Sequence, residues 1–448
     1  MASPLSSANA DAPRPPRSGF VRIMGNVGHL LGGKAGAGLI SLVYLVMVTR
    51  GLGSDGYGRL VLLNGIVIFV GSLVAFSGFH GLVRYGALAL AERDIARFAL
   101  IARFMAVVEI AFGVIAALVS LAAIHVLMPR WGWPPAYGWA ALCYSLAVAG
   151  TVRATPQGLL QVAGRFDLIG LHQLVSPVVR LVGATVAWLN GGGLLLFTLA
   201  WAASGVLEGV AMWLLALPQW RRIAAGQSVL GPWRPAAGSA PGLIPFIVTT
   251  NFDITIRELA PNLAPLTIGW VLGPAAAGIY ALTQRASAVL AQPAQALGQA
   301  SYAVLAELVA ARHYDALARA VWKSVTMAAI VGIPILILFA RWGDGLLALL
   351  GGGSFRGGAT LLLLVGAGRL ALLGAAPLAS ALTALGYPSR SMTISLVANL
   401  LLYPLLPVLL WWLAVDGAGW HALLQGILAF VALMLSFAAI MRSRAAAP

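Results

Sequence analysis

The chain alternates between long apolar stretches and short polar segments over almost its whole length. A helix needs about 20 apolar residues to cross the hydrocarbon core of a bilayer, and about twelve stretches meet that requirement. Their centres lie near residues 37, 69, 113, 145, 178, 205, 255, 290, 329, 370, 402 and 430. The pattern therefore predicts an all-α membrane protein with about twelve transmembrane helices.

The longest polar segment inside the chain divides these helices into two sets of six. It spans residues 219–242, where Arg, Gln, Gly and Pro replace the apolar runs. We expect residues 21–218 and 243–448 to form two six-helix lobes, with 219–242 as a cytoplasmic linker between them. Residues 1–20 are rich in Pro, Ser and Ala, a composition typical of a disordered tail, and we place this tail in the cytoplasm.

The composition supports a membrane protein and excludes a soluble one. Hydrophobic residues make up 60% of the chain and charged residues 9%, against about 25% charged residues in soluble domains. The mean hydropathy is +0.91. The net charge of +15 would suggest nucleic-acid binding in a soluble protein. Because cytoplasmic loops of membrane proteins collect Lys and Arg, we expect no nucleic-acid partner here.

Positive charge is concentrated in alternate loops, and this bias predicts the orientation of the chain in the membrane. Arginine is concentrated in the N-terminal tail, in the loops after the second, fourth and eighth predicted helices, in the linker and at the C-terminus: Arg14, Arg17, Arg22, Arg84, Arg93, Arg97, Arg153, Arg165, Arg221, Arg222, Arg234, Arg312, Arg319, Arg442 and Arg444. Both termini are therefore predicted to be cytoplasmic. Trp131, Trp342 and Trp411 fall on the opposite side, as expected for an interfacial aromatic belt.

A short motif occurs twice, once in each predicted lobe. GLGSDGYG ends at Gly58 and VLGPAAAG ends at Gly278, and each contains Leu-Gly, four residues and Gly. Both follow the first helix of their set of six, so we predict that one six-helix unit is repeated. Units with an even number of helices run in the same direction, which makes the repeats parallel and favours a substrate path between them. The glycines are expected to allow tight reversals between helices.

Two longer segments that contain this motif resemble a known family. They are TRGLGSDGYG, from Thr49 to Gly58, and WVLGPAAAGIYALTQR, from Trp270 to Arg285. With the six-plus-six plan, they are similar to the multidrug/oligosaccharidyl-lipid/polysaccharide (MOP) exporter superfamily, and within it to the polysaccharide-unit flippases of O-antigen and exopolysaccharide synthesis. The resemblance implies a V-shaped, two-lobe, MATE-like fold, alternating access and a bacterial inner-membrane location. It also implies a polyprenyl-diphosphate-linked oligosaccharide as substrate.

Polar side chains at membrane depth are costly and usually face a cavity or a partner. Lys34 and Tyr44 share one face of the first predicted helix, and His172, Ser176 and Arg180 share one face of the fifth. Two cations suit a diphosphate, so these are candidate substrate-binding residues. The alternative is that polar residues hold membrane helices together, with His172 a packed histidine instead of a proton carrier.

Four glutamines share one face of the eighth predicted helix: Gln284, Gln292, Gln295 and Gln299. An amide both donates and accepts hydrogen bonds, so this face suits a substrate covered in hydroxyl groups. Bonding between helices is again the alternative. Arg285 beside this face, like Arg84 and Arg153, lies near a predicted inner helix end and is interpreted as an interface anchor.

The seventh predicted helix is polar on two faces. Asp253 and Arg257 are four residues apart and can pair on one face, whereas Glu258 lies nearly opposite. Pro261 is expected to break the helix locally. One interpretation is an internal, neutralised pair. The other makes Asp253, Arg257 and Glu258 candidates for coupling transport to a proton or cation.

Three functions remain open at this stage. The favoured one is a flippase that moves the lipid-linked oligosaccharide across the inner membrane without covalent chemistry, among membrane lipids and glycan-assembly enzymes. The first alternative is a multidrug or cation antiporter of the same superfamily, which is disfavoured because Lys34 and Arg180 would repel cationic drugs. The second is a membrane enzyme of glycan assembly, disfavoured because no paired acids or long outer loop are evident. The scattered histidines and the single cysteine, Cys143, show no metal-ligand spacing, so neither metal nor cofactor is expected.

Overall fold

The structure is a computed structural model of the 448-residue chain, and it describes residues 19–234, 240–288, 290, 305, 307–309 and 311–445. Within these ranges the regular secondary structure is entirely helical. The prediction of an all-α protein is confirmed.

The helices follow the predicted apolar segments. The N-terminal half contains α1 (Gly19–Val74), α2 (Phe79–Gly81), η1 (Leu82–Gly86), α3 (Ala87–Ala91), α4 (Ile95–Leu127), η2 (Met128–Trp131), η3 (Pro135–Tyr137), α5 (Gly138–Cys143), η4 (Tyr144–Thr151), α6 (Ala154–Val162), α7 (Phe166–His172), α8 (Val175–Leu189) and α9 (Leu194–Ile223). The C-terminal half contains α10 (Leu243–Leu272), α11 (Pro274–Ala286), α13 (Tyr314–Gly351), η5 (Gly353–Phe355), α14 (Ala359–Ala384), α15 (Pro388–Leu396), η6 (Val397–Leu401), α16 (Leu405–Leu413) and α17 (Asp416–Ala445).

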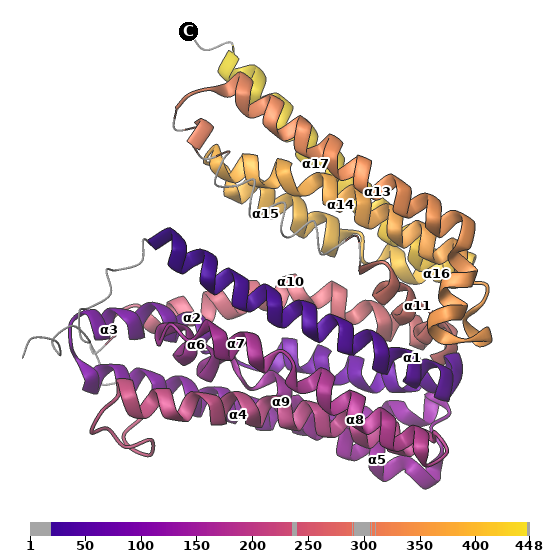
Figure 1. The fold of residues 1–448 in the computed structure, drawn as a ribbon, viewed down its shortest axis with the longest axis horizontal. Helices are drawn as coiled ribbons and strands as arrows, with labels where there is room; N and C mark the ends of the chain where they lie inside the picture. The colour runs from indigo at the N-terminus through magenta and orange to yellow at the C-terminus, as the bar shows by residue number, and fades with distance from the viewer. Residues whose placement is uncertain are drawn as a thin grey trace, which may run out of the picture.

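These helices form two arms of a V (Figure 1). One arm contains α1 to α9, the other contains α13 to α17, and α11 lies where the arms converge. The beginning of α1 and the end of α17 both lie at the open end of the V. Although α10 follows the linker, it packs along α1 and also contacts η6 and α16 of the opposite arm. It therefore forms part of the boundary between the arms.

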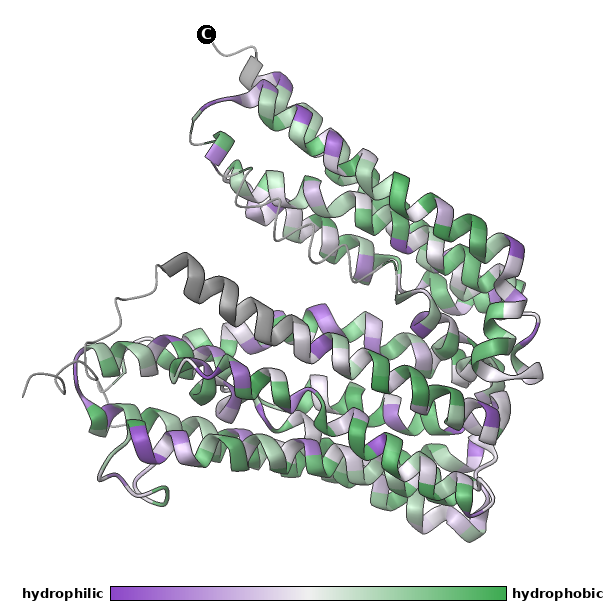
Figure 2. Ribbon diagram, viewed as in Figure 1, coloured by the Kyte–Doolittle hydropathy of each residue, from purple (hydrophilic) through white to green (hydrophobic). Residues whose placement is uncertain are grey.

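Many exposed side chains on both arms are apolar, as a lipid environment requires. Hydrophobic residues follow the helices over the length of both arms (Figure 2). Large apolar side chains such as Leu39, Leu189 and Trp411 are exposed. Surface of this kind would be unstable in water, and it is the surface that a bilayer covers.

By length and hydropathy, seven helices among the described residues are suited to cross a membrane, or eight if the pair Pro388–Leu401 and Leu405–Leu413, bent by 45°, is one span. The longest, Gly32–Val74, has 43 residues and covers the first two predicted segments in one run bent at Gly53. The segment near residue 145 is divided among short α and 3₁₀ pieces. In α10, Asp253, Arg257 and Glu258 lower the hydropathy. The predicted helix near residue 290 lies mostly outside the described residues. Together these features explain why fewer spans pass this test than the sequence predicts.

The two copies of the Leu-Gly motif adopt the same backbone conformation and meet each other. Gly53 has φ 66° and ψ −175°, and Gly273 has φ 88° and ψ 176°. These values lie outside the range that residues with a Cβ adopt easily. A Cβ on Gly58 would overlap the carbonyl oxygen of Pro274, and a Cβ on Gly278 would overlap that of Ser54. The repeated motif thus forms the contact at which the two halves converge.

The prediction that Pro261 breaks the seventh helix is wrong. α10 runs without interruption from Leu243 to Leu272, with Pro261 and Pro265 inside it. Each proline removes only one backbone donor, and neighbouring helices in a membrane protein compensate for such losses. Asn251 also secures α10 to the other half, because its amide accepts a hydrogen bond from the Ser77 N–H (2.7 Å) and donates one to the Ser77 carbonyl (3.1 Å).

Candidate functional site

A polar cavity of about 500 Å³ lies against the N-terminal arm. Its lining comes from α1, the start of α6, α7, α8 and α9, with one residue from α11: Lys34, Ala37, Ser41, Tyr44, Arg153, Gln157, Ile169, His172, Gln173, Ser176, Pro177, Arg180, Glu208, Met212 and Arg285. Segments that are far apart along the chain thus supply one concave surface, the usual form of a small-molecule site.

Four of the residues predicted for substrate binding line this one cavity. They are Lys34, His172, Ser176 and Arg180. Gln284 does not line it and lies instead in a second cavity. The other three predicted glutamines, Gln292, Gln295 and Gln299, lie outside the described residues.

Arg180 is held in place by hydroxyl and aromatic groups. Its Nε donates to Ser204 Oγ (2.9 Å), its Nη1 donates to the Tyr44 hydroxyl (3.3 Å), and its guanidinium lies 4.3 Å from the centre of the Trp201 ring. In the part of the chain that the structure describes, no carboxylate lies within ion-pairing distance of it. The guanidinium is therefore oriented while its charge remains available to a ligand.

Arg153 also reaches the cavity, so its interpretation as an interface anchor is wrong. η4 ends at Thr151, and Arg153 sits at the N-cap of α6, within the broken helix. Two hydrogen bonds hold this break: the Glu109 carboxylate accepts from the N–H groups of Ala154 (2.6 Å) and Thr155 (2.7 Å). Arg153 forms an ion pair with Glu208 of α9.

His172 is buried in the wall beside this ion pair. The residue is 3% exposed, and its Nε2 donates to the carbonyl oxygen of Glu208 (2.7 Å). Because a carbonyl can only accept, Nε2 carries the proton. The histidine thus joins α7 to α9, as the packed-histidine alternative requires.

Arg285 lines the cavity from α11 of the C-terminal half, and its interpretation as an interface anchor stays a prediction. Arg84, assigned the same role, lies outside the cavity lining, with its guanidinium 4.6 Å from the Phe246 ring. The lining thus holds four cationic residues, Lys34, Arg153, Arg180 and Arg285, against one acid, Glu208. This excess suits an anionic ligand.

The sequence analysis did not identify Glu208, a single acidic residue within the apolar sixth segment. Such a residue at membrane depth implies a partner. The partner, Arg153, could not be identified without the break in the fourth segment.

The coupling candidates on α10 lie outside this cavity. Asp253 and Arg257 pair as predicted, with 3.0 Å between Oδ2 and Nε, but their side chains are 39% and 53% exposed. Glu258 accepts a weak hydrogen bond from Asn262 (3.5 Å) and is also exposed. The predicted ion pair between Asp253 and Arg257 is therefore confirmed, but both side chains are exposed, so the pair is not internal.

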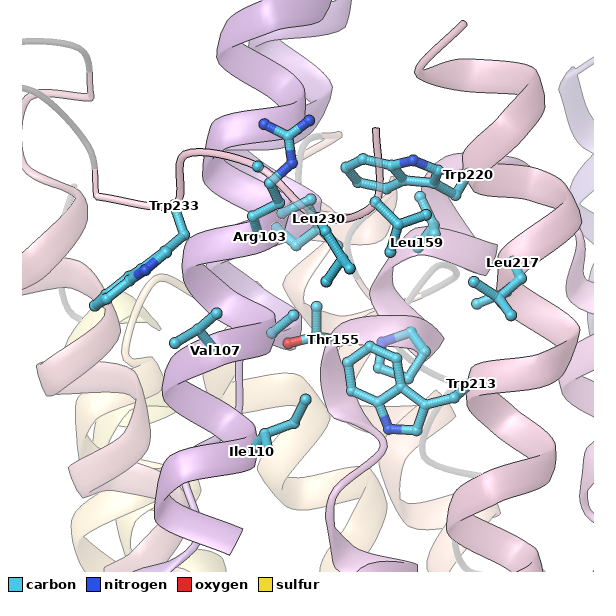
Figure 3. Close-up of a pocket in the computed structure, with 17 residues that line it drawn as sticks. Arg103, Val107, Ile110, Thr155, Leu159, Trp213, Leu217, Trp220, Leu230 and Trp233 are labelled. Carbon is cyan, nitrogen blue, oxygen red and sulfur yellow. The ribbon is translucent and has the colours of Figure 1, made fainter. Parts of the chain in front are cut away.

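A third cavity, of about 380 Å³, is apolar and lies between α4, α6, α9 and the linker. Figure 3 shows Trp213, Trp220 and Trp233 around it, with Arg103 near one end. Arg103 Nε donates to the carbonyl of Ser228 (3.0 Å), which secures the linker to α4. The lining of this apolar cavity offers few polar groups to a substrate and suits hydrocarbon chains.

Solved structures share this architecture. An inward-facing MATE family transporter of the MOP superfamily has a TM-score of 0.70 and 15% identity, over 91% of this chain and 94% of that chain. An outward-facing MATE family transporter has a TM-score of 0.60 and 14% identity, over 95% of both chains. A Vibrio cholerae MATE transporter has a TM-score of 0.59 and 16% identity, over 94% of this chain and 97% of its own. The chain is therefore a two-armed, all-helical membrane protein with the fold of MOP-superfamily transporters.

The family follows from the sequence match. The model of the family described as "Polysaccharide biosynthesis protein" matches residues 102–357, more than half of the chain. The chain belongs to this family. It is also 26% identical over 283 residues to the Inner membrane protein YghQ of Escherichia coli (strain K12), covering 63% of this chain and 80% of that protein.

Proposed function

We propose that the protein is a flippase that moves a polyprenyl-diphosphate-linked oligosaccharide from the inner to the outer leaflet of the bacterial inner membrane during polysaccharide biosynthesis. The observation that carries the proposal is the excess of positive charge in the cavity, with four cationic residues against one acid. A diphosphate brings negative charge into a region of low dielectric, where it must be paired. Membership of the polysaccharide biosynthesis family is consistent with a glycan as the rest of the cargo.

In this proposal the cavity binds the cargo and makes or breaks no covalent bond, so the protein is not an enzyme. Arg180 is pre-oriented by Tyr44 and Ser204 and can donate to phosphate oxygens in a fixed geometry. Lys34 adds a point charge on the facing helix. Membrane lipids and enzymes of glycan assembly are the expected partners.

The arrangement of the arms supports a state that is open to the cytoplasm. At the closed end, Thr49 Oγ1 donates to the Leu350 carbonyl (2.7 Å) and Arg50 Nη2 donates to the Leu349 carbonyl (2.9 Å). The open end carries the beginning of α1 and the end of α17, and the loop arginines predict that this side is cytoplasmic. The higher TM-score to the inward-facing transporter, 0.70 against 0.60 for the outward-facing one, agrees with this assignment.

Substitution of the cavity cations tests the proposal. Lys34→Ala and Arg180→Ala are each expected to reduce glycan export at least tenfold, because losing a charge-assisted hydrogen bond costs about 1.5–3 kcal/mol. Export is measured as surface polysaccharide, together with accumulation of the lipid-linked unit in the inner leaflet. Protein abundance should stay near that of the unmodified chain.

Lys323→Ala is the matched control, because Lys323 is exposed on α13 and lies outside the cavity. It should export normally. Normal export by both cation variants would contradict the proposal. If the unmodified protein instead confers resistance to cationic drugs, the antiporter alternative replaces it.

A further inference from the structure

A second polar cavity, of about 460 Å³, lies within the C-terminal half, between α10, α11 and helices of the second arm. It is lined by α10, which packs on α1, and by α11, α14, η6 and α17: Ala260, Pro261, Ala264, Pro265, Tyr280, Gln284, Val365, Gly368, Arg369, Leu372, Asn399, Tyr403, His421, Ala422 and Gln425. Gln284 lines this cavity, and its neighbour Arg285 lines the cationic cavity. Neighbouring residues of α11 therefore line the two cavities.

Among the described residues, Arg369 is the only charged one in this lining. It lies in the middle of α14, which is long and apolar enough to span the membrane. Its Nη2 donates to the side-chain oxygen of Gln284 and to the Gln284 carbonyl (3.3 Å). Gln284 is in turn fixed by Tyr280, whose hydroxyl accepts from Nε2 (2.6 Å). The neutral Gln284 amide thus positions the Arg369 guanidinium but does not neutralise its positive charge.

No carboxylate neutralises Arg369 within the described residues. The lining contains neither Asp nor Glu, and none of the described ion pairs involves this arginine. On α10, Glu258 precedes Pro261 by three residues but bonds to Asn262 and lies outside the lining. Arg153 in the first cavity, by contrast, has Glu208 as its partner. An arginine at membrane depth without an acid is costly unless a ligand supplies the negative charge.

The remaining polar groups of the cavity are neutral and suit hydroxyl groups. Asn399 accepts a hydrogen bond from Gln425 (2.6 Å), and His421 Nε2 donates to the Leu402 carbonyl (3.1 Å). The Tyr403 hydroxyl bonds to Thr267. Each amide and hydroxyl keeps further donor or acceptor capacity, so a sugar ring can be bound without leaving a buried group unpaired.

We propose that this second cavity is a subsite for an acidic sugar, in which Arg369 binds the carboxylate and Gln284, Asn399 and Gln425 bind the hydroxyl groups. The planar guanidinium can form two parallel hydrogen bonds with a carboxylate. The inference rests on the proposed flippase function and adds to it a preference for glycans that carry a uronic acid.

Binding to the purified full-length protein in nanodiscs tests the subsite. The probes are two undecaprenyl-diphosphate disaccharides that differ only in their terminal residue, glucuronic acid in one and glucose in the other. The unmodified protein should bind the glucuronate form about 10-fold more tightly, the effect of one charge-assisted pair. Arg369→Gln should abolish this preference, because it removes the cation that pairs with the carboxylate.

Arg390→Gln is the matched control. Arg390 is exposed on α15 and lies outside both cavities, so the preference should persist in that variant. If the unmodified protein binds both probes equally, or if Arg369→Gln keeps the preference, the acidic-sugar subsite is refuted while the flippase proposal stands. If neither probe binds, the flippase proposal itself fails.

Discussion

At the residue scale, the first cavity gathers charges whose roles differ. Arg153 is neutralised by Glu208, whereas Arg180 is held by Tyr44 and Ser204 without an acid. A paired arginine contributes less net attraction to an incoming anion than an unpaired one. We therefore expect Arg180 to contribute more to binding of a diphosphate than Arg153, whose ion pair also joins α6 to α9.

The Asp253–Arg257 pair on α10 provides a prediction at the same scale. If the two side chains only neutralise each other, the double variant Asp253→Arg with Arg257→Asp should restore most of the export that either alanine variant loses. The swapped pair keeps the spacing of four residues and can form the same contact. Export is measured as surface polysaccharide at matched protein abundance.

A failed swap with normal protein abundance would point to a different role for Asp253. The carboxylate would then carry the coupling proton or cation, since its position and not its pairing would be required. Glu258→Gln, measured beside it, separates the two acids of α10, because Glu258 makes only a weak bond to Asn262.

Among the helices, the closed end of the V depends on the close approach of α11 to the part of α1 that follows the bend at Gly53. Gly58 and Gly278 meet backbone to backbone, and Ser54 N–H donates to Ser354 Oγ (3.1 Å) across the arms. The approach is possible only because neither glycine has a side chain. The repeated motif thus acts as a paired surface that lets the arms close at this end.

Gly278→Val should weaken closure at this end. The added side chain would overlap the Ser54 carbonyl, and overpacking of this kind costs about 1–3 kcal/mol. In a Cys143→Ala background with Ser54→Cys and Ser354→Cys, oxidation should give a disulfide between the arms. Its yield should fall severalfold when Gly278→Val is added.

Gly345→Val is the control for this experiment, because a Cβ at Gly345 meets no atom within 4 Å. Cross-linking should be unchanged in that variant. An undiminished yield in Gly278→Val would show that the motif does not limit closure.

For the molecule as a whole, the V opens on the side where α1 begins and α17 ends, and the loop arginines predict that this side is cytoplasmic. In a Cys143→Ala background, single cysteines at Ser354 and Ser228, both exposed, probe the two sides. A membrane-impermeant thiol reagent added to intact cells should label Ser354→Cys alone. Labelling of Ser228→Cys alone would reverse the orientation and make the observed state outward-facing.

Features that depend on local pattern could be predicted from the amino-acid sequence. Hydropathy predicts helices in a membrane, and the helical period places His172, Ser176 and Arg180 on one face and pairs Asp253 with Arg257, because these relations involve residues within a few turns. The repeated Leu-Gly motif predicted two like halves, since duplication leaves its trace in the chain itself.

Which of these helix faces meet could be seen only in the folded protein. Arg153 and Arg285 were expected at the membrane interface, yet they join Lys34 and Arg180 in one cavity, because the break at α6 and the position of α11 depend on packing between distant segments. The role proposed for Arg369 also depends on the fold. Gln284 of α11 bonds to it, and the described lining contains no carboxylate. Charge at a membrane site is a sum over several helices, and no window of the sequence contains that sum.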